Sequence, residues 1–219
     1  MFALYEKLLA IERSMATRSA VFDPAESSIG QNARQWFFST LSRNLGLTPA
    51  IQTKLSLADI GLGLFETLDG DPSEEGYYWC TPTNCRVFAY TGGGGTHFSF
   101  LSLGGIVDET SPVIATLPSD LGCTVVVGEN LLDFLCLGCL RGFYCIEQIN
   151  HKPYQAFFNS QTFRPTEKQA RSGFETNAAK EAILGYIRHN LNLKPWSDVS
   201  ERLAYLDEKY GEFIEYPPQ

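Results

Sequence analysis

The chain has 219 residues, of which 44% are hydrophobic, 13% aromatic and 19% charged. This composition is typical of a globular protein and excludes a disordered, collagen-like or coiled-coil chain, and the length favours one large domain or two small ones. The formal net charge of −8 should repel phosphate backbones and anionic membranes, which argues against nucleic-acid and membrane binding.

The first zone of the chain, residues 2–65, is predicted to be largely helical. Apolar residues recur at helical spacing between residues 2 and 12. A secretion signal needs an uncharged apolar stretch, whereas Glu6 and Glu12 lie within this one, so we expect a cytoplasmic protein. A second helix is expected at about residues 31–46.

A short acidic loop followed by aromatic residues comes next. Its turn-forming sequence carries four acidic and then three aromatic side chains: Asp69, Asp71, Glu74, Glu75, Tyr77, Tyr78 and Trp79. The acids do not match the spacing of an EF-hand calcium loop. They fit either a solvated loop or a charged contact surface, and the adjacent aromatic side chains are of the kind that anchor protein interfaces.

The middle zone is predicted to be rich in strands. Strands are expected at residues 86–90, 97–103, 113–116 and 124–127, where β-branched and aromatic residues are bounded by glycine or proline. The Gly92–Gly95 run between the first two leads into a strand, and no lysine follows it, so we interpret it as a hairpin turn and exclude a phosphate loop. The connections are too short for crossover helices, which predicts antiparallel pairing.

The third zone returns to helix. Asn130 is expected to cap one helix, and Ser197 or Asp198 to cap the last one, with another helix expected at about residues 167–191. The longest nearly apolar run, residues 131–140, is about half the length that a membrane-spanning helix needs.

This order of elements predicts the α+β fold class. We expect a largely antiparallel central sheet covered by helices, with helical segments at the N-terminal and C-terminal ends. A single domain is expected over residues 1–219, with a helical extension at about residues 160–219.

Cysteine and histidine side chains are the candidate catalytic or metal-binding groups. The six cysteines are even in number, and without a secretion signal we expect them to be reduced. The spacing Cys136-x-x-Cys139, with Cys145 beyond it, could indicate a redox pair or zinc ligands. Because Cys136 is predicted to lie inside a helix and no fourth ligand has diagnostic spacing, we interpret these as buried thiols. His97 is interpreted as a structural, hydrogen-bonded histidine. No metal or cofactor is expected.

Negative charge is concentrated in the middle of the chain. Residues 55–140 contain eleven acidic residues but one basic residue, Arg86, which gives this stretch a net charge of −10. Such a charge should attract a basic partner. The candidate partner-binding residues are Asp69, Asp71, Glu74, Glu75, Tyr77, Tyr78, Trp79, Asp108 and Glu109.

Three motifs occur in order within residues 85–150. They are a glycine-rich turn before a strand that bears histidine and aromatic residues (88–101), an extended Pro-Val strand (111–114), and an Asn-Leu-x-x-Phe-Leu helix start (126–135). Their order and spacing resemble the SUKH superfamily, which includes bacterial immunity proteins and a yeast cell-wall regulator. Gly94 stands where that family often has aspartate.

The resemblance implies an α+β fold without a catalytic site and a function in binding. Many SUKH members neutralise toxins, often nucleases, that are delivered by neighbouring cells. We therefore expect a bacterial immunity protein whose partner is a basic protein toxin, which agrees with the charge distribution. The alternatives are an enzyme that uses Cys139 or His97, and a regulatory adaptor protein.

Overall fold

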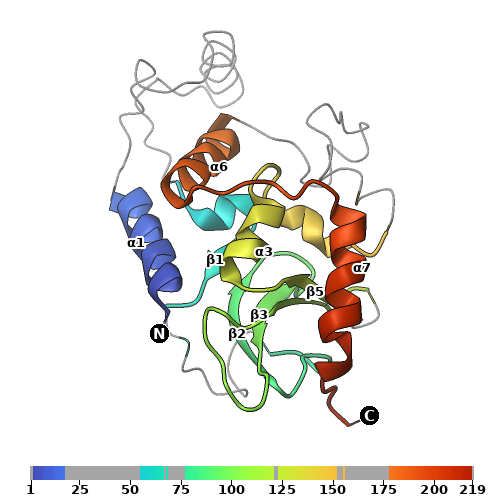
Figure 1. The fold of residues 1–219 in the computed structure, drawn as a ribbon. Coiled ribbons are helices and arrows are strands. Elements are labelled where there is room, and N and C mark those ends of the chain that lie inside the picture. The colour runs from blue at the N-terminus through green and yellow to red at the C-terminus, as the bar shows by residue number, and fades with distance from the viewer. Residues whose placement is uncertain are drawn as a thin grey trace.

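The architecture is an antiparallel sheet with helices packed around it (Figure 1). The structure is a computed structural model and describes residues 2–17, 55–66, 68, 77–120, 123–151, 155 and 178–218. Its described part contains a five-stranded sheet and four α-helices, which confirms the predicted α+β class. The helix predicted at residues 31–46 lies outside the described residues. Residues 167–177 of the helix predicted at about residues 167–191 also lie outside them.

The sheet is a simple meander in which each strand pairs with the next along the chain. Its strands are β1 (Gly63–Leu64), β2 (Cys85–Tyr90), β3 (His97–Leu101), β4 (Val113–Leu117) and β5 (Cys123–Gly128). All four pairings are antiparallel, as the short connections predicted. The sequence predicted β2 to β5 but not β1, which has only two residues.

The described α-helices are α1 (Ala3–Thr17), α3 (Leu131–Gly138), α6 (Ala178–Leu191) and α7 (Val199–Tyr210). Three 3-10 turns accompany them, at Leu57–Ile60, Tyr144–Gln148 and Gly211–Phe213. The predicted caps are confirmed, because Asn130 Oδ1 accepts a hydrogen bond from Asp133 N at 2.9 Å and Asp198 Oδ1 accepts one from Glu201 N at 3.0 Å. None of these described helices combines the length and apolar character that crossing a bilayer requires.

An aromatic cluster fills the core between one face of the sheet and the helices. The rings of Phe88 and Phe100 stack with their centroids 4.3 Å apart. Phe134 of α3 lies 4.8 Å from Phe98 and 5.0 Å from Phe143. Side chains from α1, α6 and α7 join the same cluster, so the C-terminal helices share the core of the sheet.

Helix α7 lies beside the edge strand β5 and joins the two faces of the sheet (Figure 1). Leu203 belongs to the main core, whereas Leu206 packs with a second, smaller cluster formed by Leu101, Ile114 and Val126. The chain after α7 then returns to the start of β2, where Thr83 N donates to Glu215 O at 2.8 Å. This helix therefore covers a strand edge that would otherwise be open to other chains.

Candidate functional site

The nine candidate residues fall into three groups in the structure. Asp69, Asp71, Glu74 and Glu75 lie outside the described residues. Tyr77, Tyr78 and Trp79 lead into a turn beside the β2–β3 hairpin, and Asp108 and Glu109 lie in the loop before β4.

Trp79 stands at the tip of a well-braced turn. Thr81 N donates to Tyr78 O at 2.9 Å, and Tyr78 N donates to the Thr81 hydroxyl at 2.7 Å. These two bonds fix the backbone on both sides of Trp79, whose side chain is 72% exposed. The backbone is thus fixed at a residue whose large aromatic side chain lies in solvent, although tryptophan is usually well buried.

His97 supports this turn from inside the protein. Its Nδ1 lies 2.9 Å from Gly95 O and its Nε2 lies 3.0 Å from the Thr81 hydroxyl. Since a carbonyl only accepts, Nδ1 carries the proton and Nε2 accepts from Thr81. Burial lowers the pKa of His97, which favours this neutral form. The prediction of a structural, hydrogen-bonded histidine is confirmed by these contacts.

The glycine hairpin allows Tyr78 to approach His97. The two rings stack with centroids 5.5 Å apart and an interplanar angle of 14°. Gly95 has φ of +75°, and a Cβ there would lie 2.7 Å from the Tyr78 ring. The predicted hairpin is confirmed, and Gly95 supplies both the backbone conformation and the space that Tyr78 needs.

Two further aromatic residues lie near the hairpin. Tyr90 is opposite His97 in the β2–β3 register, so the two side chains share a face of the sheet. The Phe65 ring lies 5.3 Å from the Tyr90 ring. We call Phe65, Tyr78, Trp79 and Tyr90 the aromatic rim. Tyr78 and Tyr90 are 45% and 40% exposed. Sequence reasoning missed Tyr90 and Phe65, although the hairpin register gave a signal for Tyr90.

Asp108 and Glu109 are engaged within the chain. Asp108 Oδ1 accepts from both the backbone N and the hydroxyl of Thr110, at 2.8 and 2.6 Å, and these bonds lower the pKa of Asp108. Glu109 Oε2 accepts from Leu4 N at 2.6 Å in the first turn of α1. Asp108 therefore stabilises its own loop, and Glu109 joins this loop to α1. The Tyr77 hydroxyl also has a contact inside the protein, since it accepts from Val87 N at 3.4 Å.

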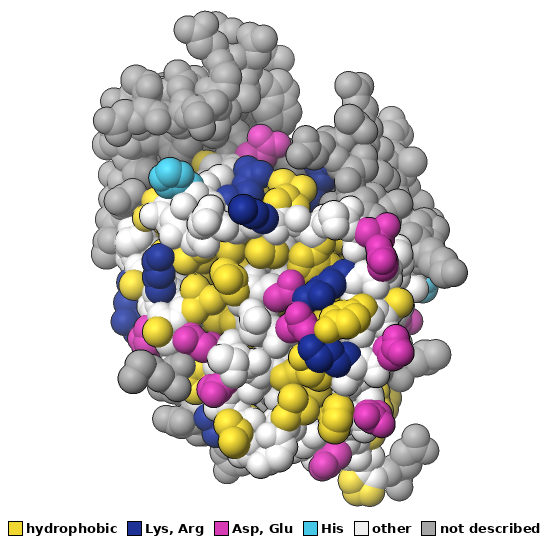
Figure 2. Space-filling model, viewed as in Figure 1, with side chains coloured by type: hydrophobic (Ala, Val, Ile, Leu, Met, Phe, Trp, Pro, Cys, Tyr) yellow, Lys and Arg dark blue, Asp and Glu magenta, His cyan; other side chains and the backbone are white. Residues whose placement is uncertain are grey.

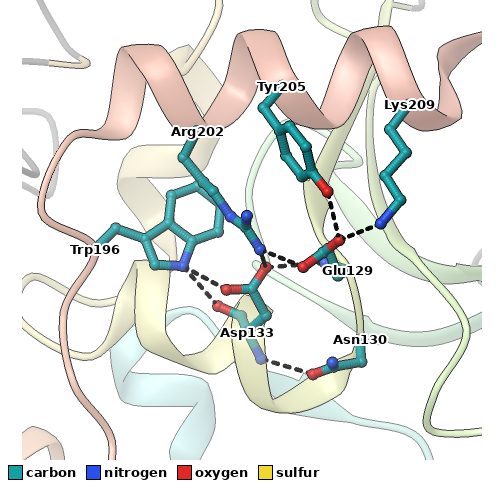
Figure 3. A network of polar contacts seen from close by, with 7 residues as sticks. All are labelled: Glu129, Asn130, Asp133, Trp196, Arg202, Tyr205 and Lys209. Carbon is teal, nitrogen blue, oxygen red and sulfur yellow. Dashed lines mark hydrogen bonds and ion pairs between the residues drawn. The ribbon is translucent and has the colours of Figure 1, made fainter.

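Glu129 and Asp133 are paired with cations of α7 (Figure 3). Arg202 lies 2.7 Å from Glu129 Oε2 and 2.8 Å from Asp133 Oδ2, and Lys209 lies 2.6 Å from Glu129 Oε1. The Trp196 indole donates to Asp133 Oδ1 at 2.9 Å. Figure 2 shows acidic and basic side chains side by side over the region of α7. This pairing was not predicted from the sequence, and it offsets part of the negative charge in residues 55–140.

The α7 network makes stability depend on pH. A hydrogen bond from Lys209, together with Arg202, lowers the pKa of Glu129 from its ordinary 4.5 to about 2. A lowered carboxyl pKa stabilises the fold above pH 4.5, and that contribution is lost as the pH falls toward 2. We expect urea unfolding to show wild type more stable than Glu129→Gln at pH 7, with the difference shrinking below pH 4.5. The exposed Glu208→Gln serves as the control, and a Glu129→Gln difference that stays constant in acid would contradict this assignment.

Five of the thiols lie in surroundings that disfavour the thiolate. Burial raises the pKa of Cys80, Cys85, Cys136, Cys139 and Cys145, reaching about 11 for Cys85 and about 12 for Cys139. Both ring nitrogens of His97 are bonded to groups other than thiols. Within the part of the chain that the structure describes, no three His, Cys, Asp or Glu side chains are grouped to hold a metal ion.

We expect these five thiols to react slowly with iodoacetamide at neutral pH, because the thiolate is the reactive form. Mass spectrometry of the labelled native protein gives the rate at each cysteine. The urea-unfolded protein, which should label quickly, provides the control. Rapid labelling of Cys139 in the native protein would instead favour the enzyme alternative.

Comparisons with known proteins returned no match among family models, curated proteins or solved structures.

Proposed function

We propose that this protein is a non-catalytic, cytoplasmic binding protein of the SUKH type, and that it is an immunity protein for a basic toxin domain. The observation that carries the proposal is the exposed Trp79 on a turn braced by Thr81 and His97. Tryptophan and tyrosine dominate the binding energy of protein interfaces. A turn whose backbone is already held in place loses little entropy on binding, which favours tight association.

The charge of the chain supports a basic partner. Four acidic residues, at positions 69, 71, 74 and 75, directly precede the aromatic residues in the sequence. A nuclease presents a basic surface to its nucleic acid, and an acidic protein that covers this surface would associate quickly through electrostatic attraction. The partner class that fits both features is a basic protein toxin.

The contacts of His97 and the thiols favour binding over catalysis. An enzyme that used Cys139 or His97 would need an activated thiol or a histidine with a nitrogen available to substrate. Burial raises the Cys139 pKa to about 12, and the His97 nitrogens are engaged by Thr81 and Gly95. The adaptor alternative differs in its genetic neighbourhood, since an immunity gene lies beside a gene for a large secreted toxin.

The acidic loop should control the rate at which the partner binds. The partner is first captured from native cells at low ionic strength, identified and purified. We then expect the fourfold variant Asp69→Asn, Asp71→Asn, Glu74→Gln and Glu75→Gln to associate about tenfold more slowly at low salt, with a weaker salt dependence. Surface plasmon resonance measures both rates, and dissociation should change less than association.

A matched control separates a local effect from a change in net charge. The exposed residues Glu181, Glu201, Glu208 and Glu212 can be replaced by glutamine in one variant, which removes the same number of charges from α6, α7 and the residues after it. Association should slow much less in this variant. Equal slowing in both variants, or none in the first, would show that the acidic loop is not part of the contact surface.

A further inference from the structure

The chain after α7 crosses back to the residues that precede β2 and is held there by hydrogen bonds. Asn84 uses both ends of its side-chain amide, since Nδ2 donates to Phe213 O at 2.7 Å and Oδ1 accepts from Glu215 N at 3.0 Å. Thr83 donates twice to Glu215 O, from its backbone N at 2.8 Å and from its hydroxyl at 3.2 Å. We call residues 212–216 the strap. Two adjacent residues thus hold the strap in place.

The strap buries little of its own apolar surface. Ile214 packs against the smaller apolar cluster, which contains Leu206 of α7. Phe213 and Tyr216 are 46% and 57% exposed. A segment that is held mainly by exposed hydrogen bonds opens at a lower free energy than the core does. The hydrogen bonds to Thr83 and Asn84 therefore decide whether the strap is closed.

A short and stiff connection joins the strap contact to the turn that carries Trp79. Thr81 closes this turn, and Pro82 is the one residue between Thr81 and Thr83. The proline ring fixes the φ angle at that position. Pro82 is also buried, and its carbonyl accepts from Cys85 Sγ at 3.1 Å. The position of Thr83 is therefore passed on to the turn.

The sheet and the strap hold this connection at different points. Ser102 N donates to Asn84 O at 2.8 Å, so the sheet fixes the backbone of Asn84. The backbone N of Thr83 is bonded to Glu215 O of the strap instead. Thr83 is the nearer of the two to the turn, and its backbone N–H depends on the strap.

We infer that the strap positions the Trp79 turn for partner binding, acting through Asn84, Thr83 and Pro82. The inference rests on the proposed function and adds the element that controls its contact surface. A turn that is fixed before the partner arrives loses less conformational freedom on binding, so a closed strap favours tight association. Coupling between two sites is reciprocal, which means that a partner bound at the turn also stabilises the closed strap.

The variant Asn84→Ala tests the link between strap and turn without a partner. Amide hydrogen exchange, followed by NMR, should become about tenfold faster at Glu215 and also faster at Thr81. The order parameter of the Trp79 indole N–H should fall, because the turn gains motion. Faster exchange at Glu215 with Thr81 and Trp79 unchanged would overturn the inference.

Two further variants make this test specific. Ser200→Ala is the matched control, since it removes an exposed side-chain hydrogen bond from α7, and it should leave exchange at Thr81 unchanged. Glu215→Pro removes the N–H that Asn84 accepts, and the extended backbone of Ile214 suits a following proline. It should speed exchange at Thr81, and adding it to Asn84→Ala should have no further effect, because both act on the same contact. Additive effects on Thr81 would contradict this route.

Binding of the purified partner tests the consequence. Calorimetry should show about fivefold weaker binding to Asn84→Ala than to wild type. In the wild-type protein, the bound partner should slow hydrogen exchange at Glu215, as reciprocal coupling requires. If Trp79→Ala loses the partner while Asn84→Ala keeps full affinity, the contact surface stands and the strap inference fails. If the partner binds both variants as tightly as wild type, the proposed contact surface itself is wrong.

Discussion

A Phe134→Ala variant should lose about 3–5 kcal/mol of unfolding free energy, because truncating a buried phenylalanine removes apolar burial and leaves a cavity. Phe134 is fully buried, and its ring lies 4.8 Å from Phe98, 5.0 Å from Phe143 and 5.9 Å from Phe88. These partners come from the sheet and from the chain after α3. The variant thus tests whether one aromatic cluster joins the layers of the fold.

Urea unfolding followed by circular dichroism measures this loss. Leu132→Ala is the matched control, since Leu132 is on the same helix but is 45% exposed, and it should change stability by about 0.5 kcal/mol or less. Equal losses in the two variants would show that α3 does not present Phe134 to the core.

Removing Trp79 should have the largest effect on partner binding. In a Trp79→Ala variant we expect affinity for the purified partner to fall about 30-fold or more, as is typical of a central tryptophan anchor. Stability should hardly change, because the side chain is 72% exposed and its loss leaves no cavity. Isothermal titration calorimetry measures the affinity, and urea unfolding verifies the fold.

A control variant shows whether a loss of affinity is specific to Trp79. Leu132→Ala removes an exposed apolar side chain from α3 and should bind the partner like wild type. A folded Trp79→Ala variant with unchanged affinity would remove the main support for the proposed contact surface.

Local signals explain why most of the described fold could be predicted. Asn130 and Asp198 cap helices through hydrogen bonds to residues only three positions away, so these caps can be recognised from a short stretch of sequence. The hairpin at Gly92–Gly95 depends on glycines with positive φ and on the strands beside them. These features need no knowledge of distant residues.

Tertiary contacts explain what the sequence could not show. Strand β1 has two residues, and a Cβ on its Gly63 would lie 2.7 Å from the Tyr90 ring, so its pairing depends on a residue far along the chain. Arg202 meets Glu129 across 73 positions. The same is true of the aromatic rim, where Tyr78 and Trp79 were predicted from the sequence around them but Phe65 meets Tyr90 only through folding.

The acidic residues show how charge counts can mislead. Residues 55–140 have a net charge of −10, but several of their carboxylates have partners inside the protein. Glu129 and Asp133 hold α7, and Glu109 binds the first turn of α1. A charge run is therefore a weaker guide to a partner than a braced, exposed tryptophan.

Site-specific photo-crosslinking tests most directly whether the aromatic rim holds a basic protein. The variants Trp79→p-benzoylphenylalanine and Leu132→p-benzoylphenylalanine are expressed in native cells, irradiated and purified under denaturing conditions. The proposed function predicts one dominant basic protein crosslinked from position 79 and not from position 132. Crosslinking of the same proteins from both positions, or of no protein from position 79 while position 132 captures one, would contradict it.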